Sequence, residues 1–150
     1  MNRAILPLLI LGVACFAADP DHATIKELTL LIDSLPAREQ LVADVALFRG
    51  DVAPLNQQQR EATERLKKAI EGFKRLKALL QVGASVFDYP GLIALERPRH
   101  DDAENKYSMV LGIPPGWNWN QPQGINPNEF RITFDGRGFI TAIAPVLYRH

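Results

Sequence analysis

Cysteine is nearly absent from the sequence, since Cys15 is the only one in 150 residues. One thiol cannot form a disulfide within the chain, and it cannot supply the thiolates of a cysteine-ligated zinc site. A thiol enzyme is excluded as well, because Cys15 lies in a segment that we expect to be removed or modified. A domain of this length buries roughly two-thirds of its unfolded surface, so it can fold without a disulfide.

An excess of charge of either sign is also absent. The chain has 17 basic and 17 acidic residues, interspersed along its length. Binding to nucleic acid requires a basic stripe that neutralises phosphates, so we do not expect nucleic acid as a partner. The proportions of apolar and charged residues are typical of one globular domain.

The sequence lacks the common local signatures of catalysis. It has no Gly-x-Ser-x-Gly elbow, phosphate loop, His-Glu-x-x-His pair or dinucleotide fingerprint. Residues 100–104, HDDAE, concentrate metal-ligand types but lack the glycine and spacing of a calcium loop, so we expect neither a metal nor a cofactor. A small hydrolase with two carboxylates remains a second alternative, because such a site leaves no local pattern.

No hydrophobic run is long enough to span a bilayer, which takes about 20 residues. The apolar run at residues 4–13 follows Arg3 and precedes small residues up to Ala18, the layout of a signal peptide. We therefore predict a signal peptide at residues 1–17 and one mature domain at 18–150. The protein is expected to be exported, either periplasmic or secreted.

Cys15 allows one alternative to soluble export. The stretch Leu11 to Cys15, LGVAC, resembles a bacterial lipobox, with Gly12 where leucine is usual. Lipidation of Cys15 would make the protein a membrane-anchored lipoprotein, and a lipid anchor is the only membrane contact that we expect.

One long amphipathic helix is predicted at about residues 56–82. Asn56 and Gln59 form a capping box, and Gly83 is a candidate left-handed C-cap. Its apolar positions alternate spacings of three and four: Leu66, Ala69, Phe73, Leu76 and Leu80. A stripe of this width is more typical of a helix bundle than of a coiled-coil dimer.

Two shorter amphipathic helices precede it, at about residues 20–34 and 36–49. Short connections predict that the three helices of the segment 20–82 pack antiparallel to one another. Pro36 suits the first turn of the second helix, and Gly50 suits its C-cap.

The segment 86–150 is predicted to be rich in β-structure. Residues 107–113 read as a strand, and alternation around the turn Asp135–Gly138 predicts a hairpin at about 129–144. Residues 86–89 read as extended, 92–95 as a short strand and 96–106 as a charged loop. The fold class is therefore α+β, with three amphipathic helices packed on a small antiparallel sheet.

The most suggestive ligand-binding candidates are Trp117, Asn118, Trp119 and Asn120. Indole faces beside amide groups, in a loop that extends to Asn128, suit a peptide or a sugar ring. The alternative is that the indoles fill the junction between sheet and helices.

These observations favour an exported cell-envelope or secreted binding protein without enzymatic activity. We expect its partner to be another envelope or extracellular protein rather than a glycan. The main alternative is a structural or assembly component that binds copies of itself through the long helix.

Overall fold

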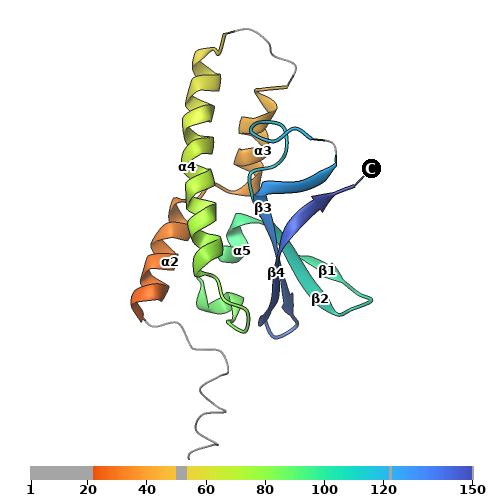
Figure 1. Ribbon diagram of the computed structural model, residues 1–150. Coiled ribbons are helices and arrows are strands. Elements are labelled where there is room, and N and C mark those ends of the chain that lie inside the picture. Colours follow the sequence, from red (N-terminus) through yellow and green to blue (C-terminus); the bar gives the residue numbers. More distant parts are fainter. Residues whose placement is uncertain (1–21, 50–53, 122, 150) are drawn as a thin grey trace, which may run out of the picture.

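The computed structural model describes residues 22–49, 54–121 and 123–149 (Figure 1). The predicted signal peptide, Cys15 and Gly50 lie outside this part of the chain. Among the described residues, no helix combines the length and the apolar character that a membrane crossing requires.

The predicted long helix is α4 (Gln57–Leu79). The Asn56 side chain accepts a hydrogen bond from the backbone amide of Gln59, and the Gln59 side chain accepts one from the backbone amide of Asn56, so the predicted capping box is confirmed. Gly83 is left-handed, with φ 92°, but α4 has already ended at Leu80. The prediction of Gly83 as its C-cap is wrong, because the Gly83 amide donates instead to the carbonyl of Ile140.

Helices α2 (His22–Ser34) and α3 (Arg38–Ala46) both run antiparallel to α4. They follow one another along it, α2 beside the C-terminal half and α3 beside the N-terminal half (Figure 1). The expectation that all three helices pack antiparallel to one another is therefore right only for α4 with each of the others. The extended link at Ala37, with ψ 156°, carries the chain onward instead of reversing it.

Four antiparallel strands form one sheet in the order β1-β2-β3-β4. Their bounds are β1 (Arg99–Asp101), β2 (Lys106–Gly112), β3 (Gly124–Asp135) and β4 (Ile140–Tyr148). The predicted hairpin is confirmed as β3 and β4, although it begins earlier and ends later than 129–144. In its turn, the Asp135 carboxylate accepts from the amides of Arg137 and Phe139.

Three short predictions are wrong. Residues 92–95 form the helix α5 (Leu92–Leu95), because Gly91 turns the chain at φ 86° and two leucines three residues apart are buried together. Residues 86–88 form the 3-10 helix η1 (Val86–Asp88), which the Ser85 hydroxyl caps. The charged loop contains β1, which pairs with Lys106–Ser108.

One face of the sheet packs on the helices and forms the core. β2 and β3 contribute alternate residues to it, and Tyr107 stacks on Phe134 at a centroid distance of 5.5 Å. The large apolar side chains buried in these strands and in α4 are those of Met109, Leu111, Phe130, Ile132, Phe134, Leu66, Phe73 and Leu76. Because side chains alternate along a strand, Ser108, Val110 and Arg131 lie on the other face.

Candidate functional site

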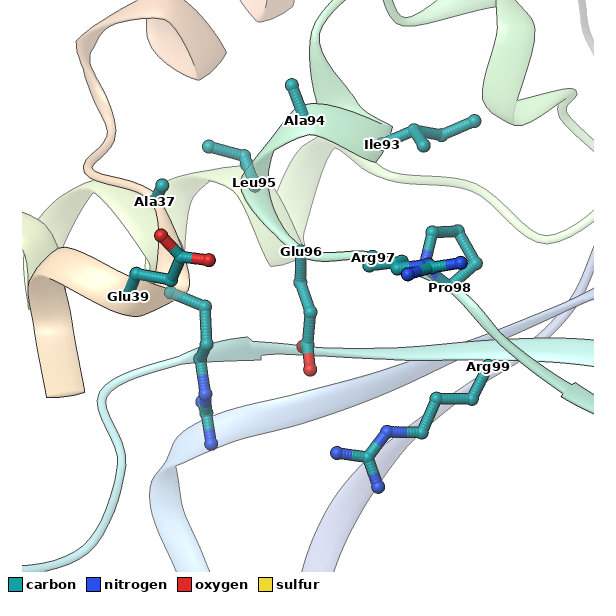
Figure 2. A pocket seen from close by; sticks show the side chains of 10 residues that line it. Ala37, Glu39, Ile93, Ala94, Leu95, Glu96, Arg97, Pro98 and Arg99 are labelled. Carbon is teal, nitrogen blue, oxygen red and sulfur yellow. The ribbon is translucent and has the colours of Figure 1, made fainter.

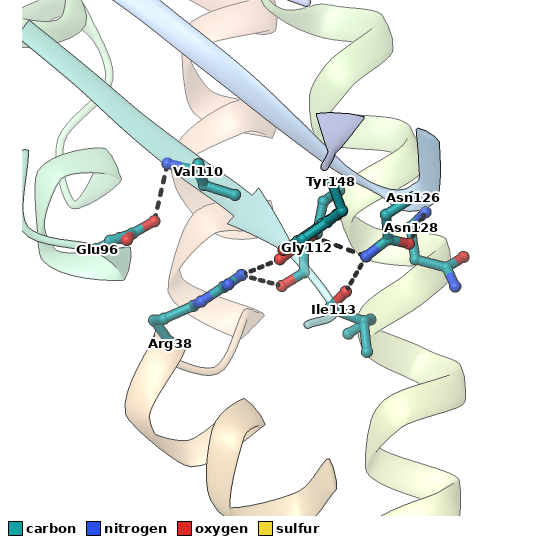
Figure 3. A network of polar contacts seen from close by, with 9 residues as sticks. Arg38, Glu96, Val110, Gly112, Ile113, Asn126, Asn128 and Tyr148 are labelled. Carbon is teal, nitrogen blue, oxygen red and sulfur yellow. Dashed lines mark hydrogen bonds and ion pairs between the residues drawn. The ribbon is translucent and has the colours of Figure 1, made fainter. Parts of the chain in front are cut away.

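A buried carboxylate, Glu129, joins α3 to the sheet (Figure 3). Arg38 Nη1 lies 2.6 Å from its Oε1, while Asn126 Nδ2 and the Tyr148 hydroxyl donate to its Oε2 at 2.8 and 2.6 Å. The Glu129 side chain is 0% exposed and that of Arg38 is 23% exposed. A charge this deeply buried is stable only when it is paired and hydrogen-bonded. Arg38 supplies the pairing charge, and Asn126 and Tyr148 supply the hydrogen bonds to Oε2.

An irregular stretch of β3 places Glu129 there. The β3–β4 register shifts between Asn126 and Phe130, and the Asn126 carboxamide accepts from the Asn128 amide. The chain comes so close to β2 at this point that a Cβ on Gly112 would lie 2.0 Å from the Asn128 carbonyl oxygen. Gly112 also has φ 118°, so only glycine fits here.

Tyr148 acts as a hydrogen-bond donor in this network. Burial, reinforced by the hydrogen bond and the negative charge of Glu129, raises the pKa of Tyr148 to about 12, although the charge of Arg38 opposes the shift. The phenol therefore keeps its proton at neutral pH, which is the form that a buried carboxylate needs.

Beyond the end of β1, two charged side chains bind the backbone of β2. Glu96 Oε2 accepts from the Val110 amide at 2.8 Å, and Arg38 Nη1 donates to the Gly112 carbonyl at 3.3 Å. Figure 3 shows the two side chains reaching β2 from α5 and α3. Both are thereby held in fixed positions.

A cleft opens beside Arg38 and Glu96, and it has two parts. The first, drawn in Figure 2, is a cavity of about 670 Å³ between the start of α3, α5 and the chain leading into β1. The second is a hollow of about 320 Å³ over the outer face of the sheet. Arg38, Glu96 and Arg99 line both parts, so the two lie side by side.

Arginine dominates the charge of the cleft. Arg38 is paired with Glu129, whereas Arg97, Arg99 and Arg131 have no ion pair or hydrogen-bonded partner within the part of the chain that the structure describes. The nearby carboxylates are Glu39, Glu96 and the buried Glu129, so guanidinium groups outnumber them by one. The arrangement is suited to binding an anionic group such as a carboxylate.

The tryptophans predicted to bind a ligand lie beside this network and do not line either part of the cleft. Trp117 is half-buried against the core and lies 6.2 Å from the ring of Phe48. Trp119 lies 5.5 Å from the ring of Tyr148, and its carbonyl accepts from the Gly116 amide. The side chains of Asn118 and Asn120 are exposed. Ligand binding by these four residues stays a prediction.

His100, the histidine of the acidic run 100–104, contacts side chains that follow it in the chain. The rings of His100 and Tyr107 lie 4.6 Å apart, and the His100 nitrogens contact Asp102 at 2.7 Å and Asn105 at 3.3 Å. In the described ranges, no group of three or more histidine, cysteine, aspartate or glutamate side chains is gathered so that it could hold a metal ion.

The sequence interpretation missed the cleft altogether. Its signals were present but weak: the run ERPR at residues 96–99, and the single acid Glu129 at the start of the predicted hairpin. Nothing in either pattern indicates that Arg38 and Arg131 lie beside them.

Comparison of the chain with models of protein families, with curated proteins and with solved structures gives no match.

Proposed function

We propose that this chain is an exported binding protein without enzymatic activity, which engages an acidic segment of another protein in the arginine-lined cleft. The observation that carries the proposal is that three guanidinium groups around one open cleft, those of Arg97, Arg99 and Arg131, have no partner among the described residues. Guanidinium groups bind carboxylates in a two-pronged geometry, and arginine is enriched among the residues that dominate interface energies.

The rigidity of the cleft supports this function. Glu96 and Arg38 are fixed to the backbone of β2, and Arg99 and Arg131 lie on paired strands. Residues held on regular elements lose less conformational entropy when a ligand binds. The volume of the first part, about 670 Å³, falls within the range of roughly 300–1,000 Å³ that is usual for ligand sites.

The packing of α4 favours binding through the cleft over self-association through the long helix. Leu66, Phe73 and Leu76 are buried within the chain's own core, so the apolar stripe of α4 is already covered. The remaining surface of α4 is charged and carries exposed ion pairs such as Lys67–Glu64 and Lys74–Glu71. Such a surface contributes little to stable association.

The test is a binding assay with fluorescein-labelled hexaglutamate, followed by fluorescence polarisation at low ionic strength. The variant R97Q/R99Q/R131Q should lose most of the binding, because it removes all three unpaired cations of the cleft. The matched control is K67Q/K74Q/K77Q, which removes the same charge from α4 and leaves the cleft unchanged. An equal loss of binding in both variants would mean that the net charge of the protein, and not the cleft, determines binding. That result would contradict the proposal.

Export is tested separately by the intact mass of the protein produced in a bacterial host with its own leader. A chain that begins at Ala18 supports soluble export. A chain that begins at Cys15 with added acyl mass supports the lipoprotein alternative, and an uncleaved chain contradicts export through either route.

A further inference from the structure

We infer that the cleft recognises an apolar side chain next to a carboxylate, so that the preferred segment of the partner carries a large aliphatic residue beside acidic residues. This inference rests on the proposed function and specifies the ligand of the same site. It follows from the different chemistry of the two parts of the cleft.

The first part of the cleft is mainly apolar. Its lining includes side chains from the start of α3, from α5 and from the link to β1: Ala37, Ile93, Ala94, Leu95 and Pro98. Leu92 and Leu95 anchor α5 in the core, which leaves Ile93 37% exposed at the cavity. Covering an exposed aliphatic side chain in a concave site with a second apolar group lowers the free energy of the complex.

The second part is polar and cationic. Arg99, Ser108 and Arg131 come from three adjacent strands, and the register places Arg99 opposite Ser108 and Arg131 opposite Val110. Arg99 on β1 and Arg131 on β3 lie on either side of β2, so their unpaired guanidinium groups can bind two successive carboxylates.

The charges at the boundary between the two parts decide where a carboxylate of the ligand can bind. Arg38 and Glu96 lie at this boundary, but Arg38 is engaged by Glu129 and Glu96 is engaged by the Val110 amide. Figure 2 shows the Glu96 carboxylate on the same side of the cavity as the Arg99 guanidinium. Arg99 is therefore the unpaired cation of the boundary. Inside the first part, the carboxylates of Glu39 and Glu96 outnumber the unpaired Arg97, which disfavours an acid there.

The experiment compares two acetylated and amidated peptides, GLEEG and GSEEG, by isothermal titration calorimetry with the purified protein. They have equal charge and differ only in the aliphatic side chain. Burial of a leucine should make GLEEG bind about tenfold more tightly or better. Equal affinities would contradict this inference and leave the proposed function standing, whereas failure of both peptides to bind would contradict both.

Variants of each part separate their contributions. A94R fills the apolar part and should abolish the preference for GLEEG while both peptides still bind; I93S serves the same purpose if A94R does not fold. R131Q should weaken both peptides by a similar factor and keep their ratio. A retained preference in both A94R and I93S, or unchanged affinity in R131Q, would overturn the two-part assignment.

Discussion

The substitution R38A should destabilise the protein more than any other arginine-to-alanine change around the cleft. Arg38 provides the charge that faces Oε1 of Glu129 and also donates to the Gly112 carbonyl. Without it, Asn126 and Tyr148 still bind Oε2, but Oε1 loses its cation in a buried site.

The expected cost can be worked from these contacts. Removing one partner of a buried ion pair costs about 3–5 kcal/mol, because the other charge is left uncompensated. Arg38 is 23% exposed, so water can reach part of the space that it leaves, and Oε2 keeps both of its donors. We therefore expect the lower end, about 3 kcal/mol, and a fall of the melting temperature by roughly 6–12 °C.

The assay is urea unfolding followed by circular dichroism at 222 nm, with a constant m-value as the check that only stability has changed. R131A is the matched control, since Arg131 is exposed and has no ion pair among the described residues, and it should stay within about 0.5 kcal/mol of the parent protein. Adding E129Q to R38A should restore part of the loss, because it removes the uncompensated charge.

Two results would refute this reasoning. If R38A costs no more than R131A, the Arg38–Glu129 pair contributes no net stability. If E129Q adds its full cost on top of R38A, the two side chains are not coupled, and the buried charge is not the reason for the loss.

Three further predictions concern the backbone and the phenol. G112A should lose at least about 2 kcal/mol of unfolding free energy in the same urea assay, since its Cβ would collide with the Asn128 carbonyl. G136A should be nearly neutral, because a Cβ at that position meets no atom within 4 Å. Similar values for both variants would contradict the close approach of β3 to β2. N56A should lower the free energy of unfolding by about 1 kcal/mol, because it removes the N-cap of α4. A cost no larger than that of an alanine substitution at an exposed position would argue against the cap. In an alkaline titration at 295 nm, the group with a pKa of about 12 should disappear in Y148F. Because the unfolded phenol ionises near pH 10 and the folded one only near 12, this contribution to stability is complete below pH 10 and is lost as the pH rises toward 12; stability of the parent and Y148F that falls in parallel over this range would contradict it.

The long helix and the hairpin could be predicted because each is specified locally. α4 has its capping box and its apolar stripe within one continuous segment, and the hairpin has its alternation on both sides of a strong turn. In these two elements local preference and tertiary packing agree, which is the condition under which sequence patterns are reliable.

The wrong predictions concern segments whose secondary structure is determined by tertiary contacts and not by the local sequence. β1 consists of three exposed, polar residues, and only its pairing with Lys106–Ser108 makes it a strand. The four residues of α5 are too few for any periodicity to distinguish helix from strand. The start of β3 contains Pro127 and polar residues that are typical of a loop, yet Ile125 pairs with Leu147.

The cleft could not be predicted because its residues come from five separate segments. They meet only when α3, α5 and the sheet are assembled in one register, and they include Arg38, the run 96–99, Ser108, Arg131 and Tyr148. Sequence spacing carries no information about such a meeting.

The side chains that bind the backbone of β2 also bear on the solubility of the protein. A strand edge with unpaired amide and carbonyl groups is a template on which a strand of another molecule can add, the first step of aggregation. Glu96 and Arg38 occupy two of these groups and place opposite charges in the path of an incoming strand. The same two residues that lie at the boundary of the cleft therefore oppose edge-to-edge assembly at this part of β2, and a ligand that displaced them would expose that edge.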